Sequence, residues 1–451
     1  MTARVPGTTG GALETPSIGS AAVPATAVEV APSGPVHAQL RAPASKSVTN
    51  RMLILAALAE GESLLRGPLD SDDTRACRRA MRALGAEVVD TPEGWQVTGT
   101  GGRLRAVPGA VIDVRLSGTA LRFITAMAAL ADGPVTVTGA PALLRRPVGA
   151  LVTALQALGA EAAATGGLPP VRLGGGGLRG GQVEVDVTGS SQFASAVLLV
   201  APYAREGALI TAAGAAAGGY LDLTIAMMRR WGAAAAQVND SCWRIAPAPR
   251  YMAQDEAVEY DASAAAHLFA LAAATGGAVT VVNAAAGTLQ PDAGLPVVLE
   301  RMGATIARDG DALTVCGPAR LRPVEVDLGM MPDQVTTVAA LAALAEGTSR
   351  LYGLAVTRGH ETDRLAALAR ELRKLGLSVH EAPDALEITG GHARGPARLA
   401  TYDDHRLAMA FAAIGARVPG VVVEEPWCVT KTYPSFWRDL QAAGVSWEPA
   451  G

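Results

Sequence analysis

Six short helix endings, spaced almost evenly, are the feature that most constrains how this 451-residue chain can fold. Each is a helical segment that stops at a glycine and continues into residues typical of a β strand. The glycines are Gly85, Gly159, Gly232, Gly303, Gly376 and Gly444, and consecutive ones lie 68 to 74 residues apart. Glycine commonly ends a helix because it adopts a left-handed conformation without strain. A near-constant period of this kind indicates internal repeats, so the chain is predicted to consist of six similar units.

The units share a second pattern, an apolar helix early in each unit and an amphipathic helix later. The early helices are apolar on nearly all sides, which is typical of helices enclosed within a domain. They are expected at residues 52–59, 120–130, 194–200, 264–274, 335–345 and 407–415. The later helices, such as 362–375, mix charged and apolar residues and should face solvent. The pattern predicts an α/β protein of two similar globular domains, each with three βαβαββ-like units around buried parallel helices, an inside-out α/β barrel. No G-x-G-x-x-G follows a predicted strand, which disfavours a Rossmann fold.

Composition disfavours several classes of partner. The formal net charge is −4, so the chain lacks the basic field of a nucleic-acid-binding protein. The four cysteines show no C-x-x-C spacing and the six histidines form no H-x-x-x-H or H-E-x-x-H motif, so we expect no metal site and free thiols in a reducing, cytoplasmic compartment. No segment is typical of a membrane helix. Residues 1–35 are rich in Pro, Gly, Ala and Thr and are expected to form a disordered tail.

A polar cluster precedes each early helix. The clusters span residues 45–51, 117–122, 189–192, 261–263, 332–334 and 403–406. Ser, Thr and Asp at such positions can be ordinary N-caps, which accept hydrogen bonds from the first backbone N–H groups. The same unsatisfied N–H groups and the positive end of the helix dipole also favour anion binding. Both interpretations stay open for any single cluster.

Basic residues favour the anion-binding interpretation when they are taken together. Cations recur in equivalent places of different units, at Lys46, Arg51, Arg122, Arg146, Arg364, Arg406 and Lys431. A basic residue that opens an apolar helix is costly unless it has an anionic partner. If the two halves of the chain face each other, this set would line one cleft and bind a ligand with several negative charges. Taken alone, Arg364 could form a solvated ion pair with Glu361, and Lys431 could be a surface lysine.

At these residues the chain resembles the 5-enolpyruvylshikimate-3-phosphate synthase family over nearly everything after residue 38. The resemblance rests on nine motifs in family order. They are Pro43–Ser47 with Arg51, Leu69–Asp73, Gly118-Thr119 with Arg122, Arg146-Pro147, Ser190–Phe193, Pro332-Asp333, Glu361–Leu365, Asp404–Arg406 and Lys431–Pro434. It implies two domains that close around shikimate 3-phosphate and phosphoenolpyruvate, with residues 36–44 plus 262–451 forming one domain and 45–261 the other. We expect a monomer that needs no cofactor and binds neither nucleic acid nor membrane.

The resemblance also implies roles for individual residues. Shikimate 3-phosphate would be held by Lys46, Ser47, Arg51, Ser190, Ser191, Gln192, Asp333 and His360. Phosphoenolpyruvate would be held by Lys46, Gly118, Arg146, Gln192, Arg364, Arg406 and Lys431. The transfer of the enolpyruvyl group to the 5-hydroxyl needs a general acid and a general base. Asp333, Glu361, Lys431 and Lys46 are the candidates, with the division of labour open. Gly118-Thr119 also suggests a glyphosate-sensitive member.

Three departures from the family pattern bear on affinity. Ala217 stands where a serine is usual, His360 where a lysine is common, and Phe123 where many members have proline. A lost hydrogen bond to a charged group costs about 1.5–3 kcal/mol, which would weaken binding without abolishing activity. Two alternatives remain. A UDP-amino-sugar enolpyruvyl transferase is disfavoured because loop 141–146 lacks that enzyme's cysteine, and an inactive binding protein is disfavoured because Asp333 and the other acid–base candidates are all present.

Overall fold

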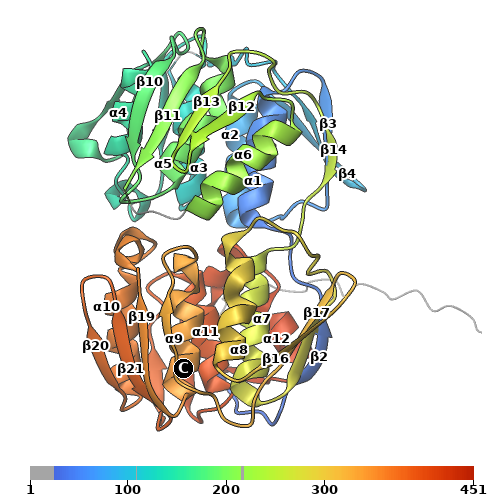
Figure 1. Ribbon diagram of the computed structural model, residues 1–451, viewed down its shortest axis with the longest axis vertical. Helices are drawn as coiled ribbons and strands as arrows, with labels where there is room; N and C mark the ends of the chain where they lie inside the picture. The colour runs from blue at the N-terminus through green and yellow to red at the C-terminus, as the bar shows by residue number, and fades with distance from the viewer. Residues whose placement is uncertain (1–24, 108, 215–217) are drawn as a thin grey trace, which may run out of the picture.

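The computed structural model describes residues 25–107, 109–214 and 218–451. They form two lobes stacked along the long axis of the molecule (Figure 1). Each lobe has its own apolar core. The core of the first lobe is built from residues between Val48 and Tyr251, and the core of the second from Val28–Ala42 and Tyr260–Val445. Ala217, one of the departures from the family pattern, lies outside the described residues.

The described residues form six four-stranded sheets, three in each lobe, which surround the lobe cores. In the first lobe the strand orders are β14 (Asp255–Ala257), β3 (Glu62–Arg66), β5 (Gly94–Thr98), β4 (Glu87–Thr91); β6 (Ala110–Asp113), β7 (Val135–Thr138), β9 (Val171–Gly175), β8 (Glu161–Ala164); and β10 (Gly181–Asp186), β11 (Ala208–Ala213), β13 (Cys242–Ile245), β12 (Ala235–Asn239). In the second lobe they are β2 (His37–Leu40), β15 (Ala278–Val281), β17 (Ala312–Cys316), β16 (Thr305–Asp309); β18 (Glu325–Asp327), β19 (Gly347–Tyr352), β21 (Leu386–Gly390), β20 (Ser378–Glu381); and β22 (Ala397–Leu399), β23 (Val421–Glu424), β1 (Ala27–Val30), β24 (Trp447–Ala450). In every sheet the first pair of strands is parallel and the other two pairs are antiparallel. The repeated pattern confirms the predicted βαβαββ-like unit.

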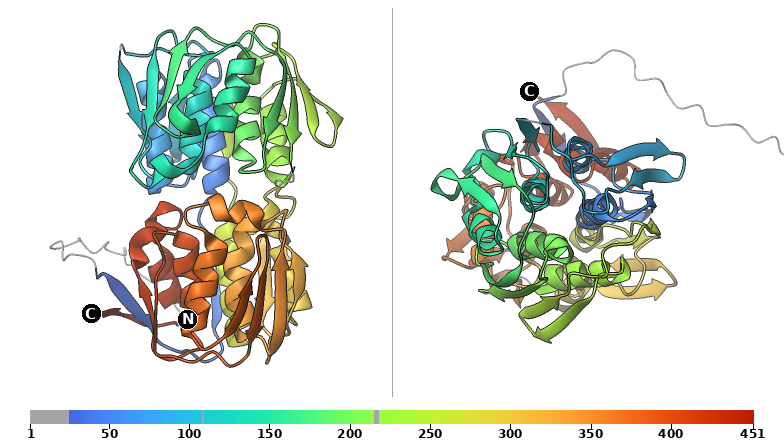
Figure 2. Two further views of the ribbon diagram at one scale, coloured as in Figure 1. Left: turned by 90° about the vertical axis from the view of Figure 1, so that its left-hand side faces the viewer. Right: turned by 90° about the horizontal axis from the view of Figure 1, so that it is seen from above.

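The early helix of each unit is buried, as predicted. These helices are α1 (Lys46–Leu58), α3 (Gly118–Ala128) and α5 (Gln192–Val200) in the first lobe, and α7 (Ala262–Thr275), α9 (Val335–Leu344) and α11 (His405–Gly415) in the second. Their residues are almost all buried because they are apolar on every side. Helices of both lobes extend to the boundary between the lobes (Figure 2), and the first residues of α1, α3, α5 and α11 line the space there. This brings several helix starts to one place.

The later helices of the units have one apolar face against the sheets or neighbouring helices. They are α2 (Asp72–Ala83), α4 (Gly149–Ala157), α6 (Gly218–Arg230), α8 (Leu295–Arg301), α10 (Arg364–Lys374) and α12 (Phe436–Ala442). In α10, Leu365 and Leu368 are buried while Arg370 and Lys374 are exposed, as the amphipathic pattern predicts. All six glycines of the repeat have φ between 79° and 102°. A side chain would strain that conformation, so the glycines end these helices for the predicted reason.

Three units take a strand from a distant part of the chain, and two of these strands, β2 and β14, precede the points where the chain crosses between the lobes. The strand β2 pairs in parallel with β15 of the second lobe, although the chain next enters α1 of the first lobe. The strand β14 pairs in parallel with β3, although the chain next enters α7 of the second lobe. The two crossing segments run side by side, with Ser45 N donating to Glu259 O at 2.8 Å and Asp261 N donating to Pro43 O at 2.8 Å. These paired crossings join the lobes on one side.

The prediction of a disordered tail through residue 35 is wrong for its last part. Residues 27–30 form β1, which lies between β23 and β24 and pairs with both in antiparallel register. Ala27, Val28 and Val30 are fully buried, while Glu29 is exposed. The apolar–polar alternation of these residues supplied a strand signal, but four residues are too short to stand out from a tail rich in small residues. Among the described residues, the helices are too short or too polar to cross a membrane.

Candidate functional site

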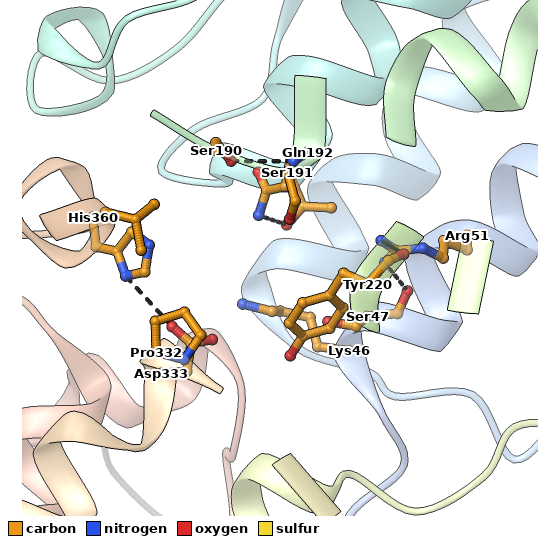
Figure 3. Close-up of a pocket in the computed structure, with 12 residues that line it drawn as sticks. Lys46, Ser47, Arg51, Ser190, Ser191, Gln192, Tyr220, Pro332, Asp333 and His360 are labelled. Atoms are coloured by element: carbon orange, nitrogen blue, oxygen red, sulfur yellow. Dashed lines mark hydrogen bonds and ion pairs between the residues drawn. The ribbon is translucent and has the colours of Figure 1, made fainter. Parts of the chain in front are cut away.

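Two adjoining cavities lie between the lobes. The larger has about 620 Å³ of empty space and is lined by Lys46, Ser47, Arg51, Thr119, Ser190, Ser191, Gln192 and Tyr220 of the first lobe and by Pro332, Asp333, Val356 and His360 of the second (Figure 3). The smaller has about 360 Å³ and is lined by Lys46, Asp73, Gly118, Thr119, Arg146, Gln192, Asp333, His360, Glu361, Arg364, His405 and Arg406. Five residues line both cavities, namely Lys46, Thr119, Gln192, Asp333 and His360. Every residue predicted for the site except Arg122 and Lys431 therefore borders one joined space.

Helix starts place many of these side chains. Ser45 and Ser117 cap α1 and α3 through their hydroxyl groups, and Asp261 and Asp404 cap α7 and α11 through their carboxylates. The starts of α5 and α9 have no side-chain cap. Capping thus accounts for four of the six polar clusters. It does not exclude anion binding, since other N–H groups in the first turn remain without helical partners.

Arg51 is a buried cation held by neutral groups. Its guanidinium donates to Thr224 Oγ1 at 2.8 Å, to Ser47 O at 3.1 Å and to Ser195 Oγ at 3.4 Å. It also lies over the rings of Phe123 and Tyr220, 5.2 and 5.6 Å from their centroids. Burial lowers the pKa of Arg51 to about 10. Within the described residues no carboxylate forms an ion pair with it, so this charge lacks a protein counter-ion.

Arg122 repeats this arrangement one unit later. It is 2% exposed, donates to Gly118 O at 2.9 Å and to Gln192 Oε1 at 3.4 Å, and lies over the ring of Phe193. Burial, reinforced by the neighbouring charge of Arg146, holds the pKa of Arg122 well below its usual value. No carboxylate of the described residues pairs with it directly. The first-lobe wall therefore carries two buried cations that would be stabilised by an anion in the cleft.

The second-lobe wall is organised by carboxylates. Asp333 Oδ1 accepts from Arg364 Nη1 at 2.7 Å, and its Oδ2 accepts from Arg406 Nη2 at 2.8 Å. Arg364 also donates to both oxygens of Asp404 and, at 3.0 Å, to Glu361. Burial of Asp333 opposes its ionisation, but the charges of Arg406 and Arg364 outweigh burial and hold its pKa below the usual range. Asp333 is therefore a carboxylate at neutral pH.

Lys431 adjoins the smaller cavity through Glu361. Lys431 Nζ donates to Glu361 Oε1 at 2.9 Å, and Arg146 Nη1 of the first lobe lies 3.7 Å from the same oxygen. Burial opposes the charge of both partners, but their mutual attraction is stronger, so the pKa of Glu361 is lowered and that of Lys431 is raised. Lys431 is 8% exposed and so is not the surface lysine of the alternative interpretation. Glu361 and Arg364 likewise form a buried ion pair, with side chains 15% and 1% exposed, rather than a solvated one.

His360 lies at the boundary of both cavities. Its Nδ1 is 3.4 Å from Asp333 Oδ1 and 3.0 Å from Arg364 Nη1. Burial, followed by the charge of Arg364, lowers the pKa of His360 to about 4. The ring is therefore neutral at pH 7. The site has no fixed positive charge at this position.

Gly118 occupies a place where a larger residue would not fit. A Cβ atom there would collide with the guanidinium groups of Arg146, which lines the smaller cavity, and of Arg122, and both groups would have to move. The absence of a side chain lets two cations pack against the start of α3. This close approach explains why glycine precedes Thr119 at the helix start.

Several residues at the site were missed from the sequence. Asp73 lies 3.6 Å from Lys46 Nζ, and Thr119 and Tyr220 line the larger cavity. Asp73 and Thr119 belong to motifs that were recognised, so their sequence positions carried a signal. Ser195 and Thr224 orient Arg51 from 144 and 173 residues away. No local pattern distinguishes these two hydroxyls from other helix residues.

Comparisons with known proteins identify one family. The family model for EPSP synthase (3-phosphoshikimate 1-carboxyvinyltransferase) matches residues 30–440. The chain is 41% identical over 417 residues to the 3-phosphoshikimate 1-carboxyvinyltransferase of Methanosphaerula palustris, which covers 91% of this chain and 98% of that protein. It is 42% identical over 420 residues to the protein of the same name from Syntrophobacter fumaroxidans, which covers 91% and 98%.

Two solved structures share the fold. EPSP synthase from Acinetobacter baumannii superposes with a TM-score of 0.79 at 24% identity and covers 94% of this chain and 100% of that one. The enolpyruvyl transferase NikO from Streptomyces tendae superposes with a TM-score of 0.74 at 17% identity and covers 94% and 99%. At these identities the two structures establish the two-lobed architecture alone.

Proposed function

The chain belongs to the EPSP synthase family, and we propose that it transfers the enolpyruvyl group of phosphoenolpyruvate to the 5-hydroxyl of shikimate 3-phosphate and releases phosphate. The observation that carries the proposal is the pair of buried arginines, Arg51 and Arg122, whose charges lack a protein counter-ion among the described residues. Leaving a buried charge unpaired is costly. Anionic ligands in the joined cavities would supply the missing charge.

The two cavities suit the two substrates. The larger offers the hydroxyls of Ser47, Ser190 and Ser191 beside Arg51, a mixture that suits a phosphorylated polyol. The smaller offers Arg146 and Arg406 beside Gly118, a more strongly cationic setting that suits the carboxylate and phosphate of phosphoenolpyruvate. Residues that line both cavities, such as Lys46, would contact both ligands. This assignment places the reacting atoms where the cavities join.

The reaction needs a proton acceptor and a proton donor on opposite sides of the new bond. In the addition step the 5-oxygen bonds to C2 of phosphoenolpyruvate, its proton passes to a base, and C3 gains a proton from an acid. In the elimination step C3 gives that proton back, the bond from C2 to the phosphate oxygen breaks, and phosphate leaves with the proton held by the base. One base and one acid therefore serve both steps.

Asp333 and Lys431 have protonation states that suit these tasks. Asp333 is ionised at the junction of the cavities, so it is proposed as the base for the 5-hydroxyl. Lys431 is protonated and is held by Glu361 at the smaller cavity, so it is proposed as the acid for C3. Glu361 would orient the ammonium group, and Lys46 would stabilise the charge of both substrates. The arginines would hold the reactants in line.

The direct test is phosphate release from the purified protein supplied with shikimate 3-phosphate and phosphoenolpyruvate. Release that requires both substrates, with formation of the enolpyruvyl ether seen by mass spectrometry, is the expected result. A parallel reaction with UDP-N-acetylglucosamine as acceptor should release no phosphate. If phosphate were released from phosphoenolpyruvate with the UDP-sugar and not with shikimate 3-phosphate, the UDP-sugar would be the acceptor and the proposal would be wrong.

All proposed ligand contacts come from one chain, so a single protomer is a sufficient catalytic unit. We therefore expect a monomer, which light scattering of the purified protein would test. The four cysteines are free thiols, which agrees with a reducing compartment and with the proposed cytoplasmic location.

A further inference from the structure

A hydrogen bond outside both cavities connects the two lobes. Thr430 lies in the 3-10 helix η7 (Pro426–Lys431) of the second lobe, and its Oγ1 donates to Asp72 Oδ2 at 2.7 Å. Asp72 is the first residue of α2 in the first lobe. The two bonded residues line a third cavity between the lobes, together with Asp73 and Lys431 among others.

The bond stands next to two residues of the proposed active site. Asp73, which follows Asp72, lies 3.6 Å from Lys46 Nζ. Lys431, which follows Thr430, is bonded to Glu361, and the charge of Asp73 also acts on Lys431. Two neighbouring residues of the first lobe thus face two neighbouring residues of the second, Asp72 opposite Thr430 and Asp73 opposite Lys431. Any shift of η7 along α2 would move Lys431 relative to Lys46.

The backbone around this boundary is held in an uncommon conformation. Among the described residues, the non-glycine residues with positive φ are Arg115, Tyr402, Asp403 and Glu425. Arg115 and Asp403 line the same third cavity, and Glu425 immediately precedes η7. Such conformations cost free energy and persist where surrounding contacts enforce them. Their grouping indicates that the loops of this boundary are fixed in place by their surroundings.

We propose that Thr430 and Asp72 form a positioning pair that sets Lys431 of the second lobe against Lys46 of the first when the lobes meet. The inference rests on the proposed function, because it assigns the pair an effect on that reaction. Neither residue lines the substrate cavities. Their effect is indirect, since small misplacements of groups that hold or protonate a substrate reduce rates strongly.

The test is a double-mutant cycle on Thr430→Val and Asp72→Ala. Thr430→Val keeps the shape of the side chain and removes the donor. Each single variant should lower kcat/KM for phosphoenolpyruvate about fivefold, or about 1 kcal/mol at about 1.4 kcal/mol per decade. Thr430→Val also removes the contact of the same hydroxyl with Trp427 O at 3.0 Å, so the double variant should be no worse than Thr430→Val, because the bond to Asp72 is already absent there. The dissociation constant of shikimate 3-phosphate should be unchanged, and Thr430→Ser should restore the wild-type rate.

Ser435→Ala is the matched control. The Ser435 hydroxyl donates to Asp439 Oδ2 at 2.7 Å within the second lobe. The substitution therefore removes the same type of hydrogen bond without changing a contact between the lobes. Wild-type kcat/KM in Thr430→Val, additive effects in the double variant, or an equal loss in Ser435→Ala would each overturn the proposal. If the wild type releases no phosphate, the proposed function fails separately. In that case small-angle scattering tests whether Thr430 and Asp72 hold the lobes together. Thr430→Val should increase the radius of gyration and Ser435→Ala should not. Equal radii for the two variants would reject the positioning pair.

Discussion

Replacement of Asp333 by asparagine separates its proposed role as a base from its role as an ion-pair partner. The asparagine keeps the size of the side chain and one oxygen, which can still accept from Arg364 or Arg406. It removes the negative charge between these two arginines, whose present distances are 2.7 and 2.8 Å. Hydrogen bonds to charged groups contribute about 1.5–3 kcal/mol each. The loss of general base catalysis alone corresponds to about 10²- to 10⁴-fold in rate.

The expected kinetic result is a large fall in kcat with a small change in the binding of shikimate 3-phosphate. Phosphate release under saturating substrates measures kcat, and calorimetric titration measures the dissociation constant. Glu371→Gln provides the control, because Glu371 is a fully buried carboxylate of the same lobe that bonds Lys374, Tyr402 and the Ala400 N–H away from the cavities. It should reduce stability and leave kcat unchanged. A kcat for Asp333→Asn within about threefold of wild type would refute the assignment, since the base contribution is about 10²-fold or more.

The same variant has a defined pH dependence of stability. The arginines hold the pKa of Asp333 below its value in the unfolded chain, which is about 3.9. A carboxylate whose pKa is lowered on folding contributes stability above the unfolded pKa and loses it as the pH falls through the folded pKa. Wild type should therefore exceed Asp333→Asn in unfolding free energy at pH 7, and the difference should shrink below about pH 4. A difference that is constant from pH 7 to pH 3 would contradict the ionised state assigned to Asp333.

Three further substitutions test other parts of the structure. Arg406→Ala should raise KM for phosphoenolpyruvate about 10- to 100-fold, the equivalent of a charge-assisted bond of about 1.5–3 kcal/mol, and an unchanged KM would remove Arg406 from the site. Phe123→Leu removes the aromatic ring beside the Arg51 guanidinium, and the loss of about 1–2 kcal/mol of cation–π energy should raise KM for shikimate 3-phosphate about fivefold or more. Phe123→Tyr keeps an aromatic ring and should have the wild-type KM. Equal KM values in the two variants would reject a role for the ring. Val28→Asp buries a charge in β1 and should lower Tm severely, whereas Glu29→Gln, on the exposed face of the strand, should leave Tm unchanged. Similar Tm values for the two variants would show that β1 contributes little to stability.

The repeated architecture could be predicted because its signals are local. A glycine such as Gly85 or Gly376 is required at a helix end by its own φ angle, whatever surrounds it. The buried helices were recognisable because each is apolar on all sides within a single segment. Helix boundaries were less predictable, since α1 begins at Lys46 and α3 at Gly118, earlier than the apolar runs themselves. The polar first turns that extend the helices are the same residues that line the cavities.

The remaining features depend on contacts between distant segments. The strand β1 is stable only between β23 and β24, which lie some four hundred residues away in the chain and contribute both of its hydrogen-bonded edges. The sequence likewise gives no indication that Thr430 meets Asp72. The grouping of cations could be inferred from repeat positions, but not which cations have carboxylate partners. Only the folded structure distinguishes Arg51, held by neutral groups, from Arg364, held by three carboxylates.

This difference between the walls bears on how the cleft responds to its ligands. On the second-lobe wall, Asp333 and Glu361 already neutralise much of the positive charge, so an arriving anion must compete with carboxylates that are 2.7 to 3.0 Å from their partners. On the first-lobe wall, Arg51 has no such competitor among the described residues. An anion gains more by binding first where charge is uncompensated. Shikimate 3-phosphate, bound beside Arg51, would then add negative charge at the junction of the cavities near Asp333. Repulsion between the ligand and Asp333 would weaken the hold of that carboxylate on Arg406 and free the arginine for phosphoenolpyruvate. The charges of the two walls therefore predict that shikimate 3-phosphate binds before phosphoenolpyruvate, and equal affinity for phosphoenolpyruvate with and without shikimate 3-phosphate would contradict this order.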